Sequence, residues 1–184
     1  MNLIHMDGCD GTNPDDLTRF EIEGRRQALL AIEALRTYTP GCENARLRDF
    51  GMTLGVRDTR KIDAAYNMTE ADVREQGRFD DTIGIYPEFI DRDGILILPT
   101  TGRYFQIPYR SMLPARVKNP LVPGKASGGD RVSHAATRNM SCCAVTGQGA
   151  GIAAALACRS NSSLETLSIG RIHQELDRQE VRYV

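Results

Sequence analysis

Residues 133–157 read SHAATRNMSCCAVTGQGAGIAAALA and place three glycines, at 147, 149 and 151, among residues that favour a helix. Each glycine inside a helix costs about 0.5–1 kcal/mol relative to alanine. Three of them within five residues indicate that something approaches the backbone closely: a strand, another helix or a flat ligand. The pattern predicts a helix over residues 141–159, in which Gly147 and Gly151 share one face and pack on a sheet, while Gly149 lies elsewhere on the helical wheel.

The segment that leads into this helix, NPLVPGKASGGD at residues 119–130, has the pattern of a short apolar strand followed by a loop rich in glycine and serine. A strand, a glycine loop and a helix in this order are typical of a parallel α/β layer, in which the strand needs neighbouring strands. The preceding hundred residues indicate a mixed and partly antiparallel arrangement without an evident second βαβ unit. The predicted fold class is therefore α/β, in part α+β, and the chain has the character of a part of a larger fold.

Local signals predict the remaining elements. Residues 11–38 are predicted to form a helix in which Asn13 caps the first turn, Pro14 takes the first helical position and Pro40-Gly41 end it. Residues 69–76 form a short helix with a capping box between Thr69 and Asp72. Residues 45–68, 81–99 and 102–114 are predicted to be extended. Residues 167–180 are predicted to form the last helix. Spacings of three and four residues predict one buried stripe on the long helix: Leu17, Phe20, Gly24, Ala28, Ala31 and Leu35.

The composition excludes several classes of function. The 184 residues are 41% hydrophobic and 26% charged with a formal net charge of −1, which is typical of one ordinary soluble domain. Basic and acidic residues are interleaved, so no nucleic-acid partner is expected. No apolar run reaches the roughly 18–20 residues that span a bilayer, and no signal peptide is evident. The five cysteines form no CxxC pair and have no histidine at ligand spacing, so we expect reduced thiols, a cytoplasmic location, and neither a metal nor a membrane partner.

Several segments, in order along the chain, resemble one family. NPLVPGKASGGDRVSHAATRNMSCCAVTGQGAGIAAALA at 119–157 looks like the C-terminal flavin-contacting segment of FAD-dependent oxidoreductases of the glutathione-reductase-like superfamily. GVRDTRKIDAAYNMTEADV is similar to that family's Gly-x-Arg-(Glu/Asp)-(Ser/Thr)-Arg segment, YFQIPYRSMLP to its Ile-Pro-Tyr-Arg-Ser-Leu-Leu-Pro run, and DGTNPDDLTRFEIEGRRQ to its early helix. The resemblance covers residues 7–180.

The resemblance implies FAD as cofactor and the C-terminal portion of a flavoenzyme. Residues 1–115 would be part of a substrate or cap domain, and residues 116–184 the C-terminal strand, loop and helix of a Rossmann-like FAD-binding domain. In that family an N-terminal GxGxxG turn after a strand holds the ADP half of FAD, and this sequence has no such turn. We therefore expect a missing N-terminal half or a partner chain to hold the ADP half, with a small-molecule substrate and a possible homo-oligomer.

The resemblance places the start of the helix near the flavin ring, and Gly124-Lys125 in the loop before it close to the ribityl chain and the pyrophosphate. A helix N-terminus offers N–H groups and partial positive charge to the electron-rich edge of a reduced flavin. Structural alternatives are a solvated loop lysine and cysteines that act as small core residues without redox chemistry. The cofactor-binding candidates are Gly124, Lys125, Ala126, Ser141, Cys142 and Cys143.

His134 and Arg138 are the catalytic candidates, because the spacing HAATR is similar to the His-x-x-x-Arg arrangement of fumarate reductase and succinate dehydrogenase flavoproteins. In those proteins the arginine binds a substrate carboxylate, for which a guanidinium has matching bidentate geometry. The alternatives are a hydrogen-bonded structural histidine and an arginine that braces phosphate or backbone.

The substrate-binding candidates are Arg57, Arg60 and Tyr109. The alternative for the two arginines is an ion pair with Asp58 or Glu70, and the alternative for Tyr109 is a half-buried tyrosine with a structural role. Two functions stay open. The chain is part of an FAD-dependent oxidoreductase that supplies the flavin-ring side of the site and part of the substrate pocket, or it is a non-catalytic subunit or remnant that acts as an interaction module without flavin. Whether the chain is itself an enzyme is left open by the sequence.

Overall fold

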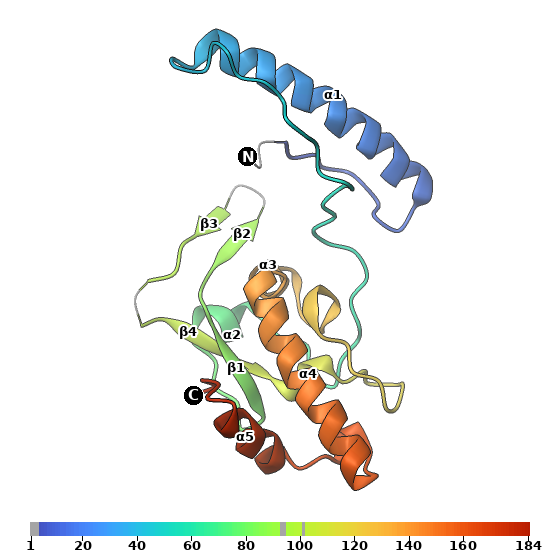
Figure 1. Ribbon diagram of the computed structural model, residues 1–184. Coiled ribbons are helices and arrows are strands. Elements are labelled where there is room, and N and C mark those ends of the chain that lie inside the picture. The colour runs from blue at the N-terminus through green and yellow to red at the C-terminus, as the bar shows by residue number, and fades with distance from the viewer. Residues whose placement is uncertain (1–3, 93–94, 101) are drawn as a thin grey trace. The chain divides into compact units, whose positions relative to one another are not determined.

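The chain divides into two units, Met1–Arg60 and Lys61–Val184. A computed structural model describes residues 4–92, 95–100 and 102–184 (Figure 1). The predicted domain boundary at residues 115 and 116 lies inside the second unit.

The first unit is built on one long helix, α1 (Pro14–Tyr38). The side chain of Asn13 accepts a hydrogen bond from the N–H of Asp15 at 3.0 Å, and Pro14 occupies the first turn, as the sequence predicts. Beyond the last turn, Gly41 has φ of +86°, a left-handed conformation that glycine adopts without strain. The helix and both of its predicted end signals are confirmed.

The predicted stripe on α1 is less buried than expected. Its six residues are all half-buried, and none of the described residues 4–60 is fully buried. On other faces of the helix, Ile22 and Leu29 are 68% and 53% exposed. The described residues of this unit hold one helix and irregular segments, so no second layer is present within the unit to enclose the stripe.

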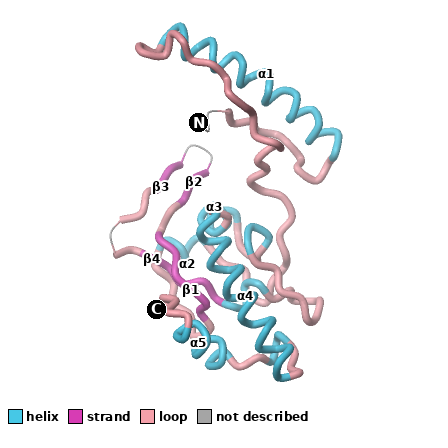
Figure 2. The backbone as a smooth tube through the Cα atoms, in the orientation of Figure 1, coloured by secondary structure: helices cyan, strands magenta, loops and turns pink. Residues whose placement is uncertain are grey.

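The prediction of a strand within residues 45–68 is wrong. The chain from residue 45 to residue 63 is irregular, drawn as loop in Figure 2, and only isolated bridges occur after it, at Ala64 and Met68. Among the described residues, no strand lies beside Thr53 and Leu54 to exchange backbone hydrogen bonds with them. Strand propensity without a partner strand does not produce a strand.

The second unit contains two small antiparallel sheets. β1 (Thr82–Pro87) pairs with β4 (Tyr104–Pro108), with Ile85 opposite Gln106, and β2 (Ile90–Arg92) pairs with β3 (Ile95–Ile97). These strands fall within the segments predicted to be extended. A 3₁₀ turn, η1 (Tyr109–Met112), follows β4 directly.

Three helices of the second unit fall in segments that the sequence predicts to be helical, whereas the helix at residues 131–137 is not predicted. The shortest predicted helix shows the local cause. α2 (Glu70–Arg74) has a complete capping box: Thr69 accepts from the N–H of Asp72, and the Asp72 carboxylate accepts from the N–H of Thr69 at 2.7 Å. The other helices are α3 (Arg131–Thr137), α4 (Met140–Ser160) and α5 (Ile169–Arg178), with a 3₁₀ turn, η3 (Leu164–Thr166), before α5.

Residues 119–123 do not form the predicted strand. One backbone hydrogen bond, from Val122 N–H to the Met112 carbonyl at 2.9 Å, holds this segment beside η1, and a 3₁₀ turn, η2 (Gly124–Ala126), follows. A parallel strand needs a neighbour on the same sheet, and the described residues supply none here. The observed mixture of helices and small sheets is consistent with the predicted α/β class.

α4 packs along β1, and the glycine that makes this possible is Gly149 (Figure 1). A Cβ on Gly149 would lie 2.7 Å from Cδ1 and 3.0 Å from Cβ of Ile83, whereas a Cβ on Gly147 or Gly151 would meet nothing within 4 Å. Gly84 of β1 likewise leaves room for the side chain of Val145 on α4. The expectation that Gly147 and Gly151 form the packing face is therefore wrong.

α4 also has the length and mean hydropathy, 1.4, of a helix that could cross a membrane, and 39% of that apolar window is buried inside the protein. The core helix of a soluble protein has the same properties. Length and composition alone therefore indicate little about a membrane.

Candidate functional site

The η2 turn and the first turns of α4, both predicted to lie near FAD, are joined by a side chain. Gly124 has φ of +77°, and its N–H donates to Oγ1 of Thr146 at 2.9 Å. The same hydroxyl donates back to the carbonyls of Cys142 and Cys143, at 3.2 and 3.0 Å. A Cβ on Gly124 would lie 3.8 Å from Sγ of Cys143, so the turn rests against the helix.

The start of α4 carries hydrogen-bond donors without acceptors. Asn139 is the N-cap residue but makes no side-chain cap, and its carbonyl accepts from the N–H of Cys143 at 2.8 Å. Within the part of the chain that the structure describes, the N–H groups of Met140, Ser141 and Cys142 have no hydrogen-bond acceptor. The Met140 side chain is exposed, and Ser141 is exposed with its hydroxyl 3.3 Å from the Tyr86 hydroxyl. Cys142 is fully buried, so the N–H groups of the exposed residues Met140 and Ser141 are the ones available to an electron-rich ligand.

Both cysteines of the vicinal pair are thiols rather than thiolates at neutral pH. Cys142 is fully buried, and burial raises its pKa far above the ordinary value. Burial also raises the pKa of Cys143, although the backbone N–H and the charge of Lys125 act in the opposite direction. Since the thiolate is the nucleophile, the pair has the character of structural cysteines.

His134 is buried and bonded to the η2 turn. Its side chain is 1% exposed, and Nε2 lies 2.9 Å from the carbonyl oxygen of Lys125. Because a carbonyl oxygen only accepts, Nε2 must carry the proton of this hydrogen bond. Arg138, half-buried at the end of α3, donates from Nη2 to the carbonyl of Asp91 at 2.6 Å.

The substrate-binding candidates fall into different units. Arg57 and Arg60 are exposed residues of the first unit, and Tyr109 belongs to the second. Tyr109 is 3% exposed and donates its hydroxyl to the carbonyl of Leu164 at 3.0 Å. Burial, with the nearby charge of Glu165 as the smaller cause, raises the pKa of Tyr109 to about 12. Its hydroxyl is thus engaged inside the protein.

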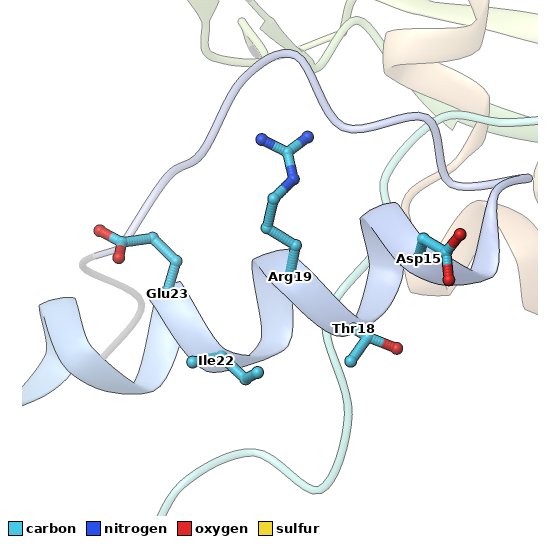
Figure 3. Close-up of a pocket in the computed structure, with 5 residues that line it drawn as sticks. All are labelled: Asp15, Thr18, Arg19, Ile22 and Glu23. Carbon is cyan, nitrogen blue, oxygen red and sulfur yellow. The ribbon is translucent and has the colours of Figure 1, made fainter.

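Two open pockets lie away from these residues. One, of about 480 Å³, follows a face of α1, where the side chain of Arg19 points away from the helix (Figure 3). The other, of about 410 Å³, lies beside β1 and β4 and includes Arg103, Tyr104 and Arg182. Neither includes a predicted site residue. The first pocket is lined by Asp15, Thr18, Arg19, Ile22 and Glu23.

Sequence reasoning missed Thr146. Its hydroxyl is the bond between η2 and α4, yet nothing in the local pattern AVTG distinguishes it from a threonine that bonds only to its own helix. The signal lies 22 residues upstream, in the glycine whose N–H it accepts.

The donor set at the start of α4 fits one end of a flavin. The pyrimidine edge of the ring presents oxygen and nitrogen acceptors, and the N–H groups of Met140 and Ser141 with the positive end of a helix dipole match that chemistry. The sequence offers no GxGxxG turn that would hold the ADP end. The residues therefore fit the ring side of FAD.

Comparison with known proteins identifies the family. A family model for FAD dependent oxidoreductases matches residues 2–176. No curated protein and no solved structure matches the chain. Because the family match extends over nearly the whole sequence, the chain belongs to the FAD dependent oxidoreductase family, whose cofactor is FAD.

Proposed function

We propose that this chain supplies the flavin-ring side of an FAD site and part of a substrate pocket, and that another segment or a partner chain holds the ADP half. The observation that carries the proposal is the pair of N–H groups on the exposed residues Met140 and Ser141, which have no acceptor among the described residues. They lie at the start of the helix within residues 119–157, the segment that resembles the family's flavin-contacting segment. In this proposal residues 116–184 belong to a Rossmann-like FAD domain.

FAD, when bound, supplies the redox chemistry, and the protein binds and orients. The N–H groups at the start of α4 would hold the pyrimidine edge and favour negative charge there through the helix dipole. Within the second unit, Arg138 is the guanidinium group proposed to bind an anionic substrate, since a guanidinium binds a carboxylate through two parallel hydrogen bonds.

A proline at position 140 tests the proposed role of these N–H groups. Proline lacks the N–H and is well accommodated at the first position of a helix. Asn139 has φ −64° and ψ 145°, an extended conformation compatible with a following proline. Met140→Pro therefore removes one donor while keeping the helix, and Met140→Ala is the matched control because the side chain is 91% exposed.

The measurement is flavin binding to the full chain, followed by the visible spectrum after desalting and by quenching of flavin fluorescence. We expect FAD and FMN to bind, ADP not to compete, and Met140→Pro to weaken binding about three- to tenfold, as expected for one lost hydrogen bond. Met140→Ala should bind like the unmodified chain. Equal affinity of the two variants would contradict the role of α4, and competition by ADP would contradict the assignment of the ring side.

An alternative function, an interaction module without flavin, is favoured by a different observation. The backbone groups of the loop after η2 are used within the protein: Ala126 accepts from Ile62 N–H, Gly128 donates to Ser111, and Gly128 accepts from Met68 N–H. A loop whose polar groups are satisfied has fewer groups to offer a cofactor. Failure of the full chain to bind FAD or FMN, alone and with a protein that supplies the GxGxxG half, would support this alternative.

A further inference from the structure

We infer that Thr146 is a positioning residue that holds the η2 turn and the start of α4 in one fixed arrangement, with His134 as its second support. The part of this inference that concerns the cofactor rests on the proposed function. The structural part, that the two segments are held together by this hydroxyl, stands on the contacts of the protein alone.

Thr146 uses both capacities of its hydroxyl. It accepts from Gly124 N–H at 2.9 Å and donates to carbonyls of its own helix, of which that of Cys143 is at 3.0 Å. Its side chain is 1% exposed, so water does not replace these bonds readily. A buried hydroxyl with both roles filled fixes the geometry of its partners more strongly than an exposed one.

His134 holds the same turn from α3. Its Nε2–H donates to the carbonyl of Lys125 at 2.9 Å, one residue after the N–H that Thr146 binds. The η2 turn is thus bonded to α4 through the N–H of Gly124 and to α3 through the carbonyl of Lys125. In this geometry His134 acts through the position of η2 rather than by direct contact with a substrate.

The consequence concerns the spacing of the proposed flavin contacts. Thr146 lies four residues after Cys142, and its back-bond to the Cys142 carbonyl at 3.2 Å connects it to the first turn of α4. Movement of η2 would therefore change its distance from the N–H groups that we propose to hold the flavin. Loss of the Thr146 hydroxyl should loosen one side of that site without removing any group that contacts the ring.

Cys143 is a natural reporter of this contact. Its sulfur faces Gly124 and is influenced by the backbone N–H of Lys125, so opening of η2 exposes it. On the same helix, Cys158 is exposed and Cys142 is buried. The full chain is alkylated with iodoacetamide, and labelling of each cysteine is quantified by mass spectrometry. Labelling of Cys143 measures local opening at η2, labelling of Cys142 measures unfolding of the helix, and labelling of Cys158 is the control for reagent reactivity.

Thr146→Val replaces the hydroxyl by a methyl of similar size, and Thr146→Ser keeps the hydroxyl. We expect Thr146→Val to raise the alkylation rate of Cys143 about tenfold, with Cys142 and Cys158 unchanged and with Thr146→Ser close to the unmodified protein. Unchanged labelling of Cys143 in Thr146→Val, or equal increases in Val and Ser, would overturn the inference. If Thr146→Val exposes Cys142 as well, Thr146→Ala removes the hydroxyl without adding a methyl group in its place, and the same criteria apply to it.

Flavin binding separates the two levels of the inference. Increased labelling together with FAD and FMN affinity that falls in Thr146→Val and returns in Thr146→Ser supports the complete inference. Increased labelling in a chain that binds no flavin before substitution, alone and with a protein that supplies the GxGxxG half, supports the structural contact and refutes the proposed function. Increased labelling with unchanged flavin affinity refutes the positioning role toward the cofactor.

Discussion

Gly149 is the residue at which a single methyl group should distinguish packing from helix propensity. In Gly149→Ala the new Cβ would lie 2.7 Å from Cδ1 of Ile83 and 3.0 Å from its Cβ. Carbon atoms in good contact are about 3.5–4.0 Å apart. The Cδ1 atom can move by rotation of the side chain, but the Cβ atom is fixed to β1, so α4 and the strand must separate by several tenths of an ångström.

The expected magnitude follows from two opposing effects. Overpacking of a core costs about 1–3 kcal/mol, and replacing a helical glycine by alanine returns about 0.5–1 kcal/mol. Gly149→Ala should therefore lower the free energy of unfolding by about 1–2 kcal/mol. Gly147→Ala, in the same helix with nothing within 4 Å of its new Cβ, should raise the free energy of unfolding by about 0.5–1 kcal/mol.

Urea unfolding followed by far-ultraviolet circular dichroism measures both variants. Ile83→Val, which removes the Cδ1 atom, should recover part of the loss when combined with Gly149→Ala, so the two substitutions should couple favourably in a double-mutant cycle. Stabilisation by Gly149→Ala equal to that by Gly147→Ala would refute the packing geometry. Additive effects of Ile83→Val and Gly149→Ala would refute the assignment of the clash to Ile83.

Two further predictions concern stability. Because burial raises the pKa of Tyr109 to about 12, the unfolded chain releases this proton from about pH 10 while the folded protein retains it, so stability present below pH 10 is lost as the pH rises toward 12. Tyr109→Phe should lower the free energy of unfolding by about 1 kcal/mol at pH 7, because the hydrogen bond to Leu164 is lost. In urea unfolding at alkaline pH, its stability should fall less steeply with pH than that of the unmodified protein, and an equally steep fall would contradict the assignment. Glu88 is 5% exposed and its carboxylate lies 2.7 Å from Nε of Arg103, so Glu88→Gln should lower the free energy of unfolding, measured by thermal unfolding, by about 1–3 kcal/mol. Asp63→Asn, at an exposed ion pair, should have no measurable effect. Equal effects of the two substitutions would show that burial does not matter at the Glu88 pair.

The parts of the fold that the sequence predicted are those with local causes. Asn13 and Pro14 begin α1, and Thr69 with Asp72 begins α2, through hydrogen bonds that span two or three residues. Such signals can be read without knowledge of the rest of the chain. The same is true of the start of α4, which the sequence predicted at residue 141 and the structure has at Met140.

The strands expected around residue 54 and at 119–123 show where local reasoning ends. Both segments have residues that favour strands, but a strand exists only when another backbone accepts and donates its hydrogen bonds. β1 and β4 satisfy that condition for each other. The segments that failed have no such neighbour among the described residues, and no property of their own composition states this.

The same limit explains why Thr146 and Gly149 could not be found in advance. A helical wheel shows which residues share a face, but it does not show which face meets the sheet; that was decided by Ile83 on β1. The observed contact has two small residues facing two larger ones, Gly149 against Ile83 and Gly84 against Val145. A pair of glycines, one in a predicted strand and one in a helix, is therefore informative only when both are considered together. The role of Thr146 depends on the same contact. Once β1 fixes the buried face of α4, the Thr146 hydroxyl lies inside the protein, where it accepts a hydrogen bond from the N–H of Gly124.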